Sequence, residues 1–178
     1  MLQTLLPVIT AFLGFGASFV LNIYSNKWND KRLKLQMDHD LRKEKRKLML
    51  EKGEELYLLL SKWSLKVSNY QHNILRVAAG KLTRMQVSEL VLNDKDKDKF
   101  NVEMMLSILR IYYPQIKPAY DDVIKVRDKA VDIGFQHERG KITDSSCFNL
   151  VSDASNLFRD KMEVLLEILR NEIAKHMD

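Results

Sequence analysis

The sequence predicts an all-α protein: an N-terminal transmembrane helix, then a long helix and an antiparallel helical bundle. An apolar run from Leu5 to Tyr24 is long enough to cross a bilayer. Downstream, apolar residues recur every three or four positions, which is the period of a helix face. Gly (6) and Pro (3) are scarce among the 178 residues, and no stretch alternates apolar with polar residues, so strands are not expected.

The predicted membrane helix lies in residues 1–26, which contain no Asp, Glu, Lys, Arg or His. Its core, residues 5–24, would extend roughly 30 Å as a helix, which matches the hydrocarbon thickness of a bilayer. A cleaved signal peptide, a buried core helix and an interfacial helix are the alternatives. The segment lacks the basic start of a signal peptide and the charged face of an interfacial helix. Aromatic and basic residues near its end are expected to anchor it at the membrane interface: Tyr24, Lys27, Trp28 and Lys31.

Small residues four positions apart, Thr10, Gly14 and Ser18, share one face of this helix. Such a face lets two membrane helices approach closely, so self-association through it is one expectation. The alternative is that small residues are simply common in membrane helices.

Charge is concentrated in residues 27–52, which hold ten Lys or Arg and five Asp or Glu, and so carry the chain's whole net charge of +5. Because positive residues follow the span and none precedes it, we expect the N-terminus outside and the rest cytoplasmic, with the chain in the inner (cytoplasmic) membrane. Contact with anionic lipid is expected from one basic cluster: Arg42, Lys43, Lys45, Arg46 and Lys47. Nucleic-acid binding is not expected, because the remaining residues are neutral.

Three domains are predicted: a transmembrane anchor at 1–26, a basic juxtamembrane helix or stalk at 27–55, and a cytoplasmic helical bundle at 56–178. The long helix carries an apolar stripe with coiled-coil-like spacing, whose predicted bundle-core residues are Leu56, Leu60, Trp63, Val67, Tyr70 and Ile74. Gly80 is expected to end this helix. Neither an internal repeat nor a long linker is expected.

Four further helices are expected near 84–92, 99–113, 118–138 and 145–176. Thr83 and Gln86 have the spacing of a capping box at the start of the first, and Thr143 is among the candidate caps of the last. The polar stretch at 93–99 is expected to form a loop or a frayed helix start.

Catalytic signatures are missing from the sequence: there is no HExxH, CxxC or Walker-type glycine loop, and no two histidines are four positions apart. Cys147 could be a reactive thiol at a helix start, but a small buried residue is the expected role. We therefore expect neither enzymatic activity nor a cofactor or metal.

The stretch Lys52-Gly53-Glu54-Glu55-Leu56-Tyr57 resembles the start of the apolar bundle in small bacterial single-pass membrane proteins with a cytoplasmic helical domain. This likeness covers about residues 5–70, and some such proteins look like accessory or anti-phage membrane components. It implies an architecture and no site residues.

The function expected from these features is a membrane-anchored interaction or scaffold module that binds a cytoplasmic protein partner, itself as a homo-oligomer, or both. The alternative is a self-assembling, membrane-perturbing effector, for example in bacterial phage defence.

Overall fold

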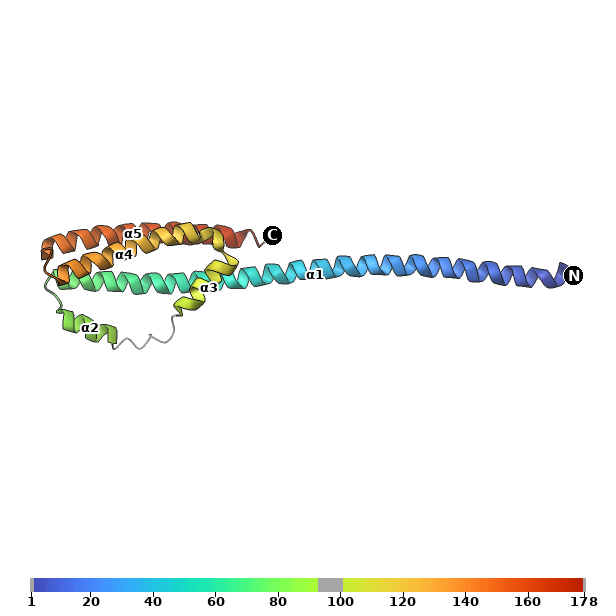
Figure 1. Cartoon of the computed structure of the whole chain (residues 1–178), viewed down its shortest axis with the longest axis horizontal. Coiled ribbons are helices and arrows are strands. Elements are labelled where there is room, and N and C mark those ends of the chain that lie inside the picture. Colours follow the sequence, from blue (N-terminus) through green and yellow to red (C-terminus); the bar gives the residue numbers. More distant parts are fainter. Residues whose placement is uncertain (1, 93–100, 178) are drawn as a thin grey trace. The chain divides into compact units, whose positions relative to one another are not determined.

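The computed structural model describes the backbone of residues 2–92 and 101–177, and the side chains of 21–90 and 101–177. Its α-helices are α1 (Leu2–Ala78), α2 (Arg84–Leu92), α3 (Val102–Tyr112), α4 (Lys117–Glu138) and α5 (Asp144–Ala174), with a 3-10 turn, η2, at Pro114–Ile116 (Figure 1). The described residues form helices and no strands, which confirms the predicted all-α class and the helical bundle.

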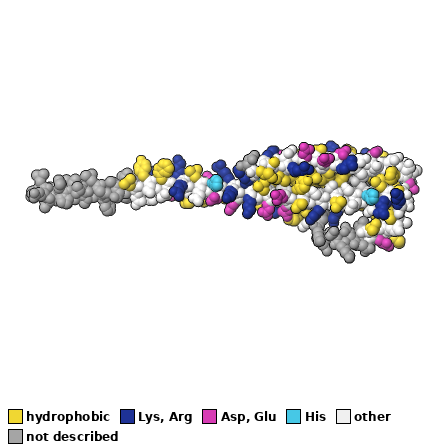
Figure 2. All heavy atoms as spheres, turned by 180° about the vertical axis from the view of Figure 1, so that it is seen from behind, with side chains coloured by type: hydrophobic (Ala, Val, Ile, Leu, Met, Phe, Trp, Pro, Cys, Tyr) yellow, Lys and Arg dark blue, Asp and Glu magenta, His cyan; other side chains and the backbone are white. Residues whose placement is uncertain are grey.

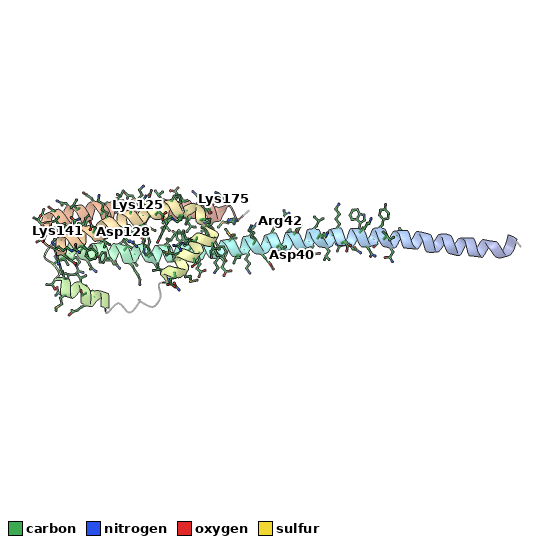
Figure 3. The ribbon with its side chains drawn as sticks, in the orientation of Figure 1. Asp40, Arg42, Lys125, Asp128, Lys141 and Lys175 are labelled. Carbon is green, nitrogen blue, oxygen red and sulfur yellow. The ribbon has the colours of Figure 1, made fainter. Side chains whose placement is uncertain are left out.

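The chain divides into two compact units, Met1–Arg46 and Lys47–Asp178. In the first unit the described side chains of α1 are exposed, Asp40 and Arg42 among them (Figure 3). Within the described residues, no helix combines the length and the apolar character that a membrane crossing requires. The predicted span falls largely on residues 1–20, whose side chains lie outside those described, so the structure gives the span no support.

The second unit is a bundle of α1 from Lys47 onward with α2 to α5. α4 and α5 pack along each other (Figure 1), and α3 and η2 complete the core near the start of α4. Trp63 of α1 lies at the centre, with its ring 5.7 Å from that of Tyr120 and 5.8 Å from that of Phe158. Burial of these aromatic rings contributes both apolar area and favourable ring contacts.

Two corners of the bundle have the same construction. α1 ends in a Schellman motif, in which the Lys81 N–H donates to the Arg76 carbonyl and Gly80 adopts a φ of 67°. α4 ends likewise, with Lys141 donating to Gln136 and Gly140 at 66°. A threonine then caps the next helix each time: the Thr83 hydroxyl accepts from the Gln86 N–H, and the Thr143 hydroxyl accepts from the Ser146 N–H.

The matching corners reveal an internal repeat with a spacing of 60 residues, so the expectation of no repeat is wrong. Gly80-Lys81-Leu82-Thr83 corresponds to Gly140-Lys141-Ile142-Thr143. Residues 103–110 (EMMLSILR) correspond to 163–170 (EVLLEILR), with five of the eight positions identical. Buried core residues fall at the same spacing, as in the pairs Leu56 and Ile116, Leu60 and Tyr120, Trp63 and Val123, Met105 and Leu165, and Leu109 and Leu169.

The bundle therefore consists of two helical hairpins that are related by this spacing of 60 residues. The first hairpin, residues 56–113, has α1 as its first arm and contains α2 and α3. The second hairpin, residues 116–173, has α4 as its first arm and the unbroken α5 as its second. Every amphipathic helix has the same spacing of apolar residues, so this spacing does not reveal a repeat. The repeat becomes visible when the two corners are compared.

Candidate functional site

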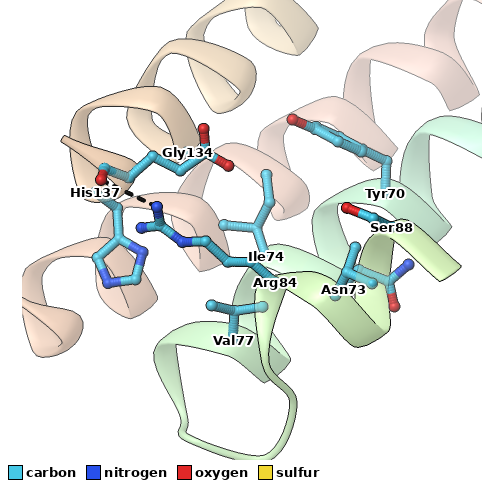
Figure 4. Close-up of a pocket in the computed structure, with 10 residues that line it drawn as sticks. Tyr70, Asn73, Ile74, Val77, Arg84, Ser88, Gly134 and His137 are labelled. Carbon is cyan, nitrogen blue, oxygen red and sulfur yellow. Dashed lines mark hydrogen bonds between the residues drawn. The ribbon is translucent and has the colours of Figure 1, made fainter. Parts of the chain in front are cut away.

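A hollow of about 390 Å³ lies at the corner where α1, α2 and α4 meet (Figure 4). Its floor is apolar, and polar groups stand at its rim. The lining residues are Tyr70, Asn73, Ile74 and Val77 of α1, Arg84, Val87 and Ser88 of α2, and Gly134, His137 and Glu138 of α4. This combination of an apolar floor with a few polar groups is typical of binding sites.

A second hollow, of about 450 Å³, continues along the same two helices. It is lined by Trp63, Lys66, Val67 and Tyr70 of α1 and by Arg127, Asp128 and Val131 of α4. Tyr70 lines both hollows, so they adjoin at this residue. We call the two together the α1–α4 groove.

The floor of the groove is shaped by a close approach of α1 to α4 at Gly134. A Cβ atom at this position would lie 3.0 Å from Cδ1 of Ile74. A side chain here would have to displace Ile74, which is partly buried. Glycine therefore lets the two helices pack tightly beneath the first hollow.

Polar contacts hold the corner end of the groove. Nη1 of Arg84 donates to the backbone carbonyl of Glu138 over 3.0 Å, which ties α2 to the end of α4 (Figure 4). Nε2 of His137 lies 2.6 Å from Oδ1 of Asp144, and the His137 side chain is only 9% exposed. The first contact holds α2 beside the hollow, and the second joins the end of α4 to the start of α5.

Tyr70 occupies the middle of the groove with 37% of its surface exposed. Burial raises the pKa of its hydroxyl, and the nearby carboxylate of Glu138 raises that pKa further. The phenol is therefore neutral at physiological pH and can both donate and accept a hydrogen bond. An aromatic ring with a polar tip is a common contact residue at protein interfaces.

The groove contains two hydroxyl groups, on Tyr70 and Ser88. In the described part of the chain, neither hydroxyl makes a hydrogen bond to a histidine or a carboxylate. Cys147 is fully buried in a separate small cluster, and that burial raises the pKa of its thiol. Among the described residues, no group of His, Cys, Asp and Glu is arranged to hold a metal ion.

Most of the predicted bundle-core residues lie in the core. Leu56 and Leu60 are fully buried, and Trp63 and Val67 retain 6% and 8% exposure. Tyr70 and Ile74 differ: Tyr70 is exposed and Ile74 is partly buried, and both line the α1–α4 groove. The reason is that a hollow lies between α1, α2 and α4 at this level, so the end of the apolar stripe faces that hollow.

The other predicted site residues lie in or next to the first unit. The expected interface anchors Tyr24, Lys27, Trp28 and Lys31 are exposed, as are Arg42, Lys43, Lys45, Arg46 and Lys47. Thr10, Gly14 and Ser18 lie on α1, but their side chains are outside those described. The structure brings none of these residues into the groove.

The groove residues of α2 and α4 were missed by sequence reasoning. Arg84, Val131 and His137 belong to no binding or catalytic motif. The apolar stripe of one helix also does not show which neighbouring helix fails to cover it. The repeat is the signal that could have found them, because it marks where the first hairpin departs from the second.

No family model, no curated protein and no solved structure matches the chain.

Proposed function

We propose that the chain is a membrane-anchored helical module that acts by binding a cytoplasmic protein through the α1–α4 groove, without catalysis. The observation that carries this proposal is the groove itself: two adjoining hollows on the bundle, with an apolar floor and polar edges. Figure 2 shows hydrophobic side chains on the surface of the second unit among charged ones. Exposed apolar surface rimmed by polar residues is typical of protein interfaces.

Membrane attachment is the second part of the proposal and rests on the sequence. Residues 1–26 have no charged side chain, and the basic excess begins immediately afterwards. This asymmetry supports one span in the inner (cytoplasmic) membrane, with the N-terminus outside and the bundle in the cytoplasm. Tyr24 and Trp28 would then lie at the membrane interface, and the basic cluster from Arg42 would follow further along α1 on the side of the anionic leaflet.

Fractionation of cells that express the full chain tests this attachment. We expect the full chain to stay in the membrane pellet after an alkaline carbonate wash, which releases peripheral proteins. A variant without residues 1–26 should be soluble and helical by circular dichroism, because its bundle keeps its own core. Release of the full chain by carbonate, or a truncated chain that remains in the pellet, would contradict the anchor.

A further inference from the structure

A row of apolar side chains runs along the exposed side of α5. Leu150, Leu157 and Val164 are spaced by seven residues, which places them on one face of the helix. An acidic row lies beside them, three positions after each apolar residue: Asp153, Asp160 and Glu167, all of them exposed. We call these six residues the α5 stripe. The stripe combines apolar surface with charge of a single sign.

A second exposed apolar pair lies on α1. Leu58 and Leu65 are also seven residues apart, and Lys62 lies between them on the same face and is exposed. The apolar residues of both helices keep between 43% and 62% of their surface exposed. A hollow of about 410 Å³, lined by Leu58 together with Tyr57 and Ile173 among others, opens beside this pair. We call Leu58, Lys62 and Leu65 the α1 stripe.

The two stripes lie at the same level of the bundle. The ring of Trp63 on α1 is 5.8 Å from that of Phe158 on α5. Gly53, earlier on α1, approaches Ile173, later on α5, so the two helices run in opposite directions. Counted along each helix from the contact of Trp63 with Phe158, three pairs share a level to within one residue: Leu65 with Leu157, Lys62 with Asp160, and Leu58 with Val164.

Membrane anchoring restricts how two copies of the chain can use these stripes, and this step rests on the proposed anchor. Copies in one membrane point the same way, so equivalent residues of neighbouring copies lie at equal heights. A symmetric pairing of two α5 stripes would then bring the two Asp160 carboxylates together. A symmetric pairing of two α1 stripes would bring the two Lys62 ammonium groups together. Both pairings are unfavourable because they place like charges side by side.

The pairing of unlike stripes places opposite charges together instead. Lys62 of one copy would face Asp160 of the next, whose contact within its own chain is a surface pair with Arg159 at 3.7 Å. Leu65 would meet Leu157 at the same height. Leu58 would meet Val164, and the hollow beside Leu58 offers room for an apolar side chain.

We propose that the bundle associates side by side with further copies of this chain, with the α1 stripe of one copy against the α5 stripe of the next. Such a contact is heterologous, so each copy keeps one stripe free and the assembly grows into a ring or a row. The stripes are separate from the α1–α4 groove, because none of their residues lines it. Self-association and partner binding in the groove can therefore occur together.

Disulfide trapping between two differently tagged full-length chains tests the proposal in intact membranes. One chain carries Leu65→Cys and the other Leu157→Cys, and copper phenanthroline is added as the oxidant. We expect the mixed dimer to exceed each like dimer at least about fivefold, because like pairings place equal charges together. Native Cys147 is fully buried, so chains without an added cysteine should give no product. In the matched control, Ile111→Cys on α3, which is 70% exposed and outside both stripes, replaces Leu157→Cys and should give only the background of random collision.

A charge exchange tests the match between Lys62 and Asp160. Lys62→Glu in the Leu65→Cys chain should lower the yield of the mixed dimer about two- to fivefold, as expected for one exposed ion pair. Asp160→Lys in the Leu157→Cys chain should then restore the yield, although either change alone lowers it. Equal yields from all four combinations would overturn the charge match.

Two results would overturn the side-by-side association itself. A mixed dimer no more abundant than the Ile111→Cys control would indicate random collision, and a predominance of either like dimer would indicate a symmetric pairing. An alkaline carbonate wash of the same membranes reports on the anchor independently. Chains that stay in the pellet without forming the mixed dimer would remove this inference alone, whereas chains released by carbonate would remove the anchor on which it rests.

Discussion

Gly53 marks a close approach between α1 and the rest of the bundle. A Cβ atom there would meet the hydroxyl of Tyr113 and lie 2.5 Å from Cγ1 of Ile173. The same hydroxyl donates a 2.5 Å hydrogen bond to the carbonyl of Met49, and Tyr113 is fully buried. One glycine thus lets α1 pack directly against a buried tyrosine and α5, although glycine is unfavourable inside a helix.

Gly53→Ala should therefore destabilise the bundle, although alanine is the better helix former. We expect the free energy of unfolding to fall by about 1–3 kcal/mol, because the added methyl group overpacks the interface. Chemical denaturation followed by circular dichroism measures the change. Ser68→Ala, at an exposed position of α1, is the control and should leave stability within about 0.5 kcal/mol. Unchanged or raised stability in Gly53→Ala would contradict the close approach.

At the residue scale, burial was largely predictable from periodicity, because apolar residues at helical spacing share a face. Leu56, Leu60, Trp63 and Val67 follow this rule. Gly53 lies in register with this stripe, but its packing role depends on Tyr113, which lies 60 residues away in the sequence. Long-range approaches of this kind leave no local signature in the chain.

At the scale of single helices, the sequence was most informative about where each helix begins and ends. Thr83 and Gln86 form the predicted capping box, since the Thr83 N–H also donates to Oε1 of Gln86 over 2.9 Å. α2 has the predicted bounds, whereas α3 begins at Val102 and not near residue 99, because Asn101 caps it by accepting from the Met104 N–H. Capping residues act through local bonds, so their spacing alone identifies them.

Removal of the two threonine caps should have different effects on the stability of the bundle, although the two caps have the same geometry. Thr143→Ala removes the cap of α5, which belongs to the core, so global stability should fall by about 1 kcal/mol. Thr83→Ala should instead speed hydrogen exchange in α2 and leave global unfolding nearly unchanged, because the described side chains of α2 are mostly exposed.

Denaturation together with hydrogen exchange read by mass spectrometry distinguishes the two threonine variants. Equal losses of global stability in both would show that α2 unfolds with the core, contrary to this account.

For the whole molecule, the helical class and the bundle followed from the sequence, but the groove did not. Periodicity along α1 and α4 predicts an apolar face on each helix and does not identify the partner of each face. Which faces remain uncovered depends on how helices far apart in the sequence pack, and the hollows between α1, α2 and α4 became visible only in the structure.

The central claim is that the groove holds a cytoplasmic partner, and one measurement tests it most directly. Tagged full-length wild type, Val131→Asp and Ser68→Asp chains are recovered from native membranes in mild detergent, and bound proteins are quantified by mass spectrometry. We predict one protein in near-stoichiometric amount with wild type and with Ser68→Asp, and its loss with Val131→Asp. Equal recovery of that protein with all three chains, or the recovery of no second protein with wild type, would contradict the claim.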